Sequence, residues 1–270
     1  MQVEPLLIIV AIAAVLSAGM IQVITGFGFA LVSIPLLFYV FPGYKAILIS
    51  ILLSVFTLTL QSRKNWRQAR WDLIWRLTAI GLVGLVVGVM VSGKLNADML
   101  KSIVGVVVFI YVIIQWVQTE KERRSGLKEQ AATTEVEVSE KIERKRKYPK
   151  GFYTAGLFSG LLTGGVGMPG PPVVAVLVQF LQRETFRATL VNYFLVNYLF
   201  ALFLALFVFQ REHQLDVLLA AASLIIPTFI GYLIGHPVRK FIKDDQFKRI
   251  VFALLLIIAL SFIWQFIFSL

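Results

Sequence analysis

Cysteine, histidine and charged residues are all scarce in this chain of 270 residues. It contains no cysteine, which excludes a disulfide framework and thiolate chemistry. Its two histidines, His213 and His236, stand apart from any carboxylate pattern, so the sequence predicts no metal site and no cofactor. Charged residues make up only 15% of the chain, whereas a soluble domain carries about 25%.

Sequence motifs for catalysis are also missing. The chain has no phosphate-binding P-loop, no HExxH metalloprotease motif and no GxSxG nucleophile elbow. A nucleotide-driven pump and an intramembrane protease would each need one of these chemistries. The sequence therefore predicts a protein that is not an enzyme.

Long apolar stretches dominate what is present. Hydrophobic residues make up 58% of the chain, and its mean hydropathy is +0.82. A helix needs roughly 20 apolar residues to cross the bilayer core. The pattern predicts an all-α polytopic membrane protein embedded in the lipid bilayer. The apolar segments are 5–24, 29–41, 46–62, 73–92, 98–117, 152–168, 171–181, 188–209, 217–235 and 250–269.

The net charge of +11 comes from basic residues that lie between the apolar segments. Segments 63–76 and 239–249 hold five each, the linker 118–150 holds ten, and Arg183 and Arg187 bring the total to 22 of 26. The positive-inside rule places such segments in the cytoplasm. We therefore expect no nucleic-acid partner, a cytoplasmic linker and both chain ends outside.

The two halves of the chain repeat each other. Gly84 and Gly88 match Gly231 and Gly235 at an offset of 147 residues, and further matches follow at slightly shorter offsets. The expected organisation is an N-terminal transmembrane repeat, 1–117, the charged linker, and a C-terminal repeat, 151–270. The charge pattern gives the repeats opposite orientations, an arrangement found in many secondary transporters.

Each repeat opens with a helix interrupted by glycine. The first break runs from Thr25 through Gly28, and the second runs from Thr163 through Pro172. The segments that follow, 29–41 and 171–181, are too short to cross a bilayer. Short Gly/Pro-broken segments at matching positions in two halves are typical of a transporter binding site.

Broken helices also explain why the expected ligand is an anion. The second half of a broken helix begins with unpaired N–H groups and a partial positive charge, which together favour anions. No charged residue lies deep in a predicted span, so these N–H groups, hydroxyls and amides would hold the substrate near the midplane. The predicted substrate-binding residues are Gln22, Thr25, Gly26, Phe27, Gly28, Ser33, Ser159, Thr163, Gly164, Gly165, Gly167, Pro169, Gly170, Asn192 and Asn197.

Helix packing is the alternative explanation for these small and polar residues. Small residues allow membrane helices to approach closely, and buried polar residues can bond between helices. Gly81, Gly84 and Gly88 are spaced like a packing face and are assigned to packing. Ser54 and Thr57 are open to both roles, as are the glutamine and the two asparagines among the predicted site residues.

The glycine-rich breaks resemble those of the TauE/SafE sulfite-exporter family, also called the toluene-sulfonate uptake permease family. The similar stretches are Gly26-Phe27-Gly28 through Pro35, and Thr163-Gly164-Gly165 through Pro172. Phe29 and Ala30 depart from the family's usual glycine run. The resemblance covers nearly the whole chain and implies that the substrate is sulfite, an organosulfonate or a related sulfur-containing anion.

Two functions from different classes fit the sequence. The first is a secondary transporter, most simply an exporter, because an inside-negative potential drives anions outward. The second is a non-transporting assembly or accessory factor that binds a partner through the basic linker. The expected location is the plasma membrane, specifically a bacterial inner membrane, and a homodimer is one expected assembly.

Overall fold

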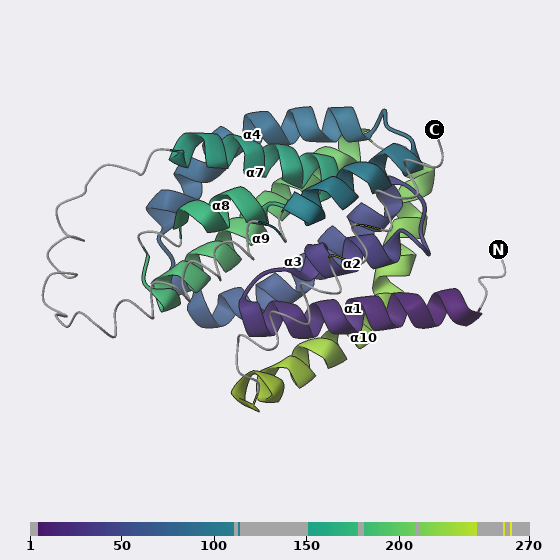
Figure 1. Cartoon of the computed structure of the whole chain (residues 1–270), viewed down its shortest axis with the longest axis horizontal. Coiled ribbons are helices and arrows are strands. Elements are labelled where there is room, and N and C mark those ends of the chain that lie inside the picture. Colours follow the sequence, from purple (N-terminus) through teal and green to yellow (C-terminus); the bar gives the residue numbers. More distant parts are fainter. Residues whose placement is uncertain are drawn as a thin grey trace, which may run out of the picture.

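The computed structural model describes residues 5–110, 113, 151–177, 181–208, 211–241, 256 and 260, and every regular element among them is a helix. Most of these helices lie along the long axis of the molecule (Figure 1). Five are long and apolar enough to cross a membrane. They are α1 (Pro5–Thr25), α3 (Tyr44–Asn65), α4 (Trp71–Ser92), α9 (Arg183–Val208) and α10 (Arg211–Phe241).

The prediction of an all-helical, multi-pass membrane protein is therefore confirmed. The short 3-10 helix η1 (Trp66–Gln68) continues α3, and residues 97–110 are helical, as expected for the segment 98–117. The predicted linker, both chain ends, and all but residues 256 and 260 of the segment 250–269 lie outside the described residues.

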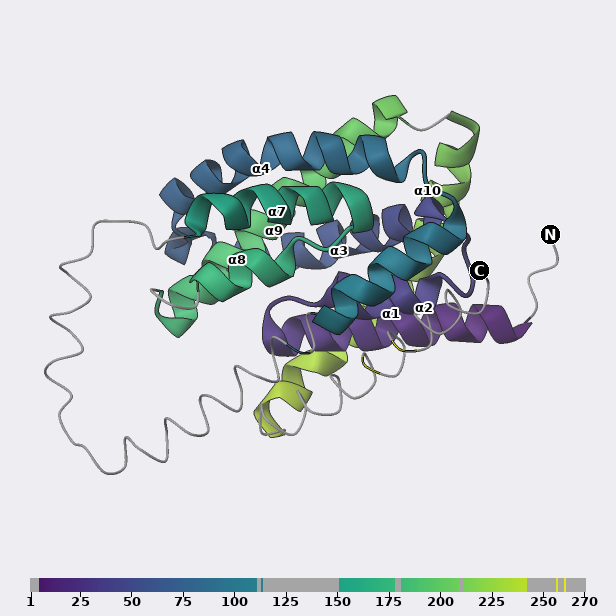
Figure 2. The same cartoon turned by 45° about the horizontal axis from the view of Figure 1, so that its top comes forward.

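The first break separates α1 from the nine-residue helix α2 (Phe29–Leu37). Gly28, at the start of α2, has a φ of 104°, a left-handed conformation that glycine adopts without the clash of a side chain. Only Gly26–Gly28 connect the two helices, so α2 packs back against α1 (Figure 2). Pro35 lies inside α2, which is far too short to cross a bilayer.

The second break separates α7 (Phe152–Val166) from α8 (Gly170–Leu177). Gly167 ends α7 with a φ of 71°, and its N–H donates to the Thr163 carbonyl at 3.0 Å. α8 packs back against α7, as α2 does against α1. Each break therefore forms the tip of a short helical hairpin.

Glycines bring two pairs of helices into backbone contact. α4 lies along α7, where a Cβ atom on Gly84 would be 2.8 Å from the Leu161 nitrogen and one on Gly88 would be 2.7 Å from the Gly165 nitrogen. α1 lies along α10, where a Cβ atom on Gly19 would be 2.8 Å from the Thr228 carbonyl oxygen. The assignment of Gly81, Gly84 and Gly88 to packing is confirmed.

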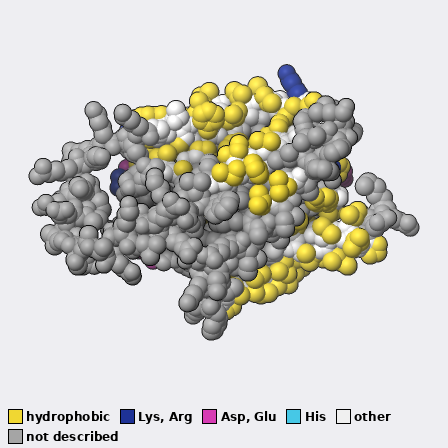
Figure 3. Space-filling view, in the orientation of Figure 1, with side chains coloured by type: hydrophobic (Ala, Val, Ile, Leu, Met, Phe, Trp, Pro, Cys, Tyr) yellow, Lys and Arg dark blue, Asp and Glu magenta, His cyan; other side chains and the backbone are white. Residues whose placement is uncertain are grey.

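Apolar side chains cover much of the outside of the bundle. Phe207 of α9 and Ile226 of α10 are 74% and 69% exposed, and Val83 of α4 is 64% exposed. Figure 3 shows one face of the molecule, with hydrophobic side chains spread over its described part. In water such a surface would be an aggregation hazard, whereas in a bilayer it is the surface that contacts lipid.

Candidate functional site

The tips of the two hairpins line one cavity in the middle of the bundle. The first break contributes Phe27, Gly28 and the first turn of α2, and the second contributes Met168, Pro169 and Gly170. The cavity is small and partly open, with about 20 Å³ available to the centre of a water-sized sphere, which is about the room that one water molecule needs. The remaining lining residues come from α1, α3 and α9 and are Gln22, Ser54, Leu58, Phe194 and Tyr198.

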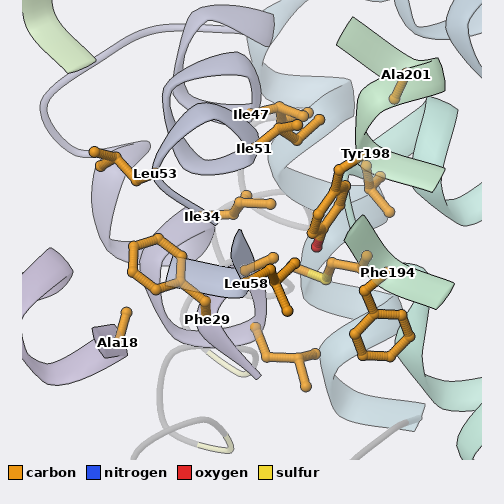
Figure 4. Packing of buried hydrophobic residues seen from close by; sticks show 14 of the residues in the cluster. Ala18, Phe29, Ile34, Ile47, Ile51, Leu53, Leu58, Phe194, Tyr198 and Ala201 are labelled. Carbon is orange, nitrogen blue, oxygen red and sulfur yellow. The ribbon is translucent and has the colours of Figure 1, made fainter. Parts of the chain in front are cut away.

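Apolar and aromatic side chains form most of the cavity wall. Figure 4 shows Leu58 of α3 between Phe29 of α2 on one side and Phe194 and Tyr198 of α9 on the other. None of the described residues that line the cavity is charged. A ligand here would be held by dipoles, with the apolar wall excluding water around it.

The start of α2 has backbone N–H groups that could donate hydrogen bonds to a ligand in the cavity. The N–H groups of the first helical turn have no partner within their own helix, and Gly28 provides no side-chain cap. The residues of this turn, Phe29, Ala30 and Leu31, all line the cavity. This geometry suits an anion, because the positive end of the α2 dipole lies at the same place.

The start of α8 is a poorer donor. Pro171 and Pro172 follow Gly170 directly, and proline has no N–H group. The Gly167 and Pro169 carbonyls accept hydrogen bonds from Tyr198 at 2.9 Å and Ser159 at 2.6 Å. These two hydrogen bonds fix the backbone of the second break. The first break therefore offers more free N–H donors to the cavity than the second does.

Gln22 and Ser54 add side-chain hydrogen-bonding groups to the wall. The Thr57 hydroxyl donates to Oε1 of Gln22 at 3.1 Å, which leaves the amide nitrogen of Gln22 as the donor end. The Ser54 hydroxyl is buried beside the Tyr198 hydroxyl and makes no hydrogen bond of good geometry within the described residues. Both groups are placed to donate to a ligand oxygen.

Five of the predicted substrate-binding residues line the cavity, namely Gln22, Phe27, Gly28, Pro169 and Gly170. Thr25 shapes the first break instead, since its hydroxyl donates to the Ile21 carbonyl at 2.9 Å and accepts the Phe27 N–H at 3.3 Å. Gly26 lies against the side chain of Arg187.

The other predicted residues do not line the cavity. Ser33 bonds to Ser50 at 2.6 Å, Ser159 and Thr163 bond within their own hairpin, and Gly164 packs on α4. Gly167 packs against Ile34 and Ile47, and a Cβ atom on Gly165 would meet nothing within 4 Å. Asn192 and Asn197 bond to Ser62 at 2.7 Å and to Thr78 at 3.3 Å.

The apolar lining residues Leu58, Met168, Phe194 and Tyr198 were not predicted. Nothing in their sequence context separates them from the many other apolar residues of their segments. Ser54 was considered only as a polar residue open to two roles. In the described part of the chain, no group of three or more His, Cys, Asp or Glu residues is arranged to hold a metal ion.

Comparison with known proteins identifies the family. The family model described as "Sulfite exporter TauE/SafE" matches residues 11–262. The chain belongs to the TauE/SafE sulfite exporter family. The resemblance seen in the glycine-rich breaks is thus confirmed over nearly the whole chain. No curated protein and no solved structure matches it. TauE/SafE proteins are membrane transporters rather than enzymes, in agreement with the five apolar helices.

Proposed function

We propose that this TauE/SafE protein is a secondary transporter that exports sulfite, an organosulfonate or a related small sulfur-containing anion. The observation that carries the proposal is that both helix breaks, far apart in the sequence, line the same cavity. The substrate would bind there, with its oxygens toward the first turn of α2, Gln22 and Ser54. The protein itself would catalyse no reaction.

We further propose that the two halves are inverted repeats. Under the sequence matches, α1 corresponds to α7, and α4 corresponds to α10. The pairing of α1 with α10 then has its counterpart in the pairing of α7 with α4, and α3 packs on its own counterpart, α9. This arrangement supports a two-fold relation, with one hairpin tip entering from each side of the membrane.

Flux measurements test the transport proposal. Liposomes that contain the purified protein are loaded with sulfite, sulfoacetate, taurine or thiosulfate. They should release at least one of these solutes faster than protein-free liposomes loaded in the same way. A potassium gradient with valinomycin sets the membrane potential. Outward flux should rise as the interior becomes more negative, because each charge gains about 2.3 kcal/mol per 100 mV. Flux that is indifferent to potential would contradict an uncoupled exporter.

Deleting residues 125–143 separates transport from the assembly-factor function. These residues belong to the basic linker, which lies outside the described residues. A transporter should keep its flux after the deletion. Loss of cellular function in a protein that still carries full flux in liposomes would favour the assembly factor.

A further inference from the structure

Arg187 carries a positive charge to the first helix break. It is the fifth residue of α9, inside the candidate span Glu184–Ala205, and it is partly buried. Its Nη2 donates to the Val23 carbonyl at 2.5 Å, in the last turn of α1 and 164 residues away in the sequence. Its positive charge also lies close enough to the Tyr232 side chain of α10 to interact with it electrostatically. Ionisable side chains within membrane-spanning helices often mark the path of a substrate or an ion.

Gly26 makes room for this arginine. A Cβ atom on Gly26 would lie 2.9 Å from Cγ and 3.1 Å from Nε of Arg187, both too close for an unstrained contact. The next two residues, Phe27 and Gly28, line the cavity. The Arg187 side chain therefore contacts the same three-residue turn that contributes Phe27 and Gly28 to the cavity wall.

The polar face of α3 leads from the cavity toward Arg187. Ser62 bonds to Asn192, and Ser54 lies beside Tyr198 further along α9, so α3 and α9 run in opposite directions and the end of α3 lies near the start of α9. Gln61, one residue before that contact, is 5% exposed, and neither atom of its amide makes a hydrogen bond. Gln61 shares a helix face with Ser54, which lies two turns nearer the cavity.

We propose that Arg187 is the residue that captures the anion at the cytoplasmic mouth of the pathway, before the anion passes Gln61 and enters the cavity. The proposal rests on the proposed export function and on its topology, in which the start of α9 is cytoplasmic. The planar guanidinium has five N–H donors and can bind two oxygens of a sulfite or sulfonate group at once. A full negative charge also competes well with the neutral Val23 carbonyl for the one donor that this carbonyl holds.

The concentration dependence of sulfite flux tests this role. Wild type, Arg187→Gln, Arg187→Lys and the control Arg67→Gln are reconstituted, and initial rates are measured with sulfite supplied on the side of Arg187. Arg67 is an exposed residue of η1 whose guanidinium lies 5.6 Å from the centre of the Trp66 ring. Arg187→Gln should raise the half-saturating sulfite concentration by about tenfold or more, since a charge-assisted hydrogen bond is lost. Arg67→Gln should leave it unchanged.

Arg187→Lys separates capture from a purely structural role. Lysine can still donate to the Val23 carbonyl, but it lacks the planar fork. A raised half-saturating concentration in a lysine variant that melts like wild type supports capture, and this variant decides the matter if Arg187→Gln does not fold. An unchanged half-saturating concentration, whether or not the maximal rate falls, overturns the proposal and leaves Arg187 as a cap on α1. A wild type that carries no anion of the panel overturns the transport function itself.

Discussion

Under the proposed function, individual hydroxyl and amide groups would let a largely apolar cavity bind an anion. Ser54 is the clearest case, because its buried hydroxyl lies beside Tyr198 but makes no hydrogen bond of good geometry within the described residues. An unpartnered buried polar group costs stability, so it is retained where a ligand or a water molecule needs it. Gln22 differs, because Thr57 fixes its carbonyl end and thereby orients its donor end.

Replacing Ser54 by alanine should weaken anion binding without weakening the fold. The substitution removes only a poorly aligned contact with Tyr198, so the melting temperature in detergent should stay nearly the same. The half-saturating sulfite concentration should increase by roughly three- to tenfold, the value of one hydrogen bond. Ser17→Ala is the control, because Ser17 bonds only to carbonyls of its own helix. Equal effects of the two variants on flux would remove Ser54 from the site.

Gly26→Ala should disturb the placement of Arg187. The new methyl group would press on the arginine side chain in a backbone conformation, φ 88°, that already disfavours alanine. Gly43→Ala is the matched control, since Gly43 also has a positive φ, 61°, and its Cβ atom would meet only Ala97 at 3.9 Å. Both variants should lose about 1 kcal/mol of stability from backbone strain. Only Gly26→Ala should also raise the half-saturating sulfite concentration, and a rise in both variants would point to general loosening.

At the scale of helices, neighbouring glycines on α7 have different tasks. Gly164 faces α4, where a Cβ atom would lie 2.8 Å from the Val89 nitrogen, whereas a Cβ atom on Gly165 would meet nothing within 4 Å. The Gly164 carbonyl also accepts hydrogen bonds from Tyr44 at 2.8 Å and Ser92 at 3.2 Å. The end of α7 is thus anchored to α3 and α4 through one residue.

This contrast predicts opposite outcomes for alanine at the two positions. Gly164→Ala should destabilise the protein by about 1–3 kcal/mol, because the added methyl group pushes two helix backbones apart. Gly165→Ala should be close to neutral. Thermal unfolding of both variants in detergent measures the difference. A Gly165→Ala variant that melts normally but loses flux would return Gly165 to the binding site.

At the scale of the whole molecule, the side of the membrane from which each hairpin enters depends on how the two halves of the chain are oriented in the membrane. The chain has no cysteine, so single cysteines introduced for labelling have no background. Cysteines at Gly126 and at Gln2 should react from opposite sides of the membrane, with Gly126 accessible only from the cytoplasm. Labelling of both positions from the same side would contradict the proposed topology, and with it the inverted relation of the repeats.

The sequence by itself determined the class of protein, most helix boundaries and the location of the two breaks. These features are local: apolar length selects a spanning helix, and glycine or proline at a given position ends it. The spacing of Gly84 and Gly88 also indicated a packing face, because helical periodicity places them on one side of α4.

Only the tertiary structure decided which residues share the cavity and where Arg187 points. Leu58, Phe194 and Tyr198 belong to long apolar helices in which every turn looks alike in sequence, and the facing helices select the turns that meet the breaks. Ser33 and Asn192 look like pathway residues in the sequence, but they have partners on neighbouring helices. Arg187 follows the positive-inside pattern, yet its side chain lies over Gly26, because the carbonyl that it binds is brought to it by a helix from the other half of the chain.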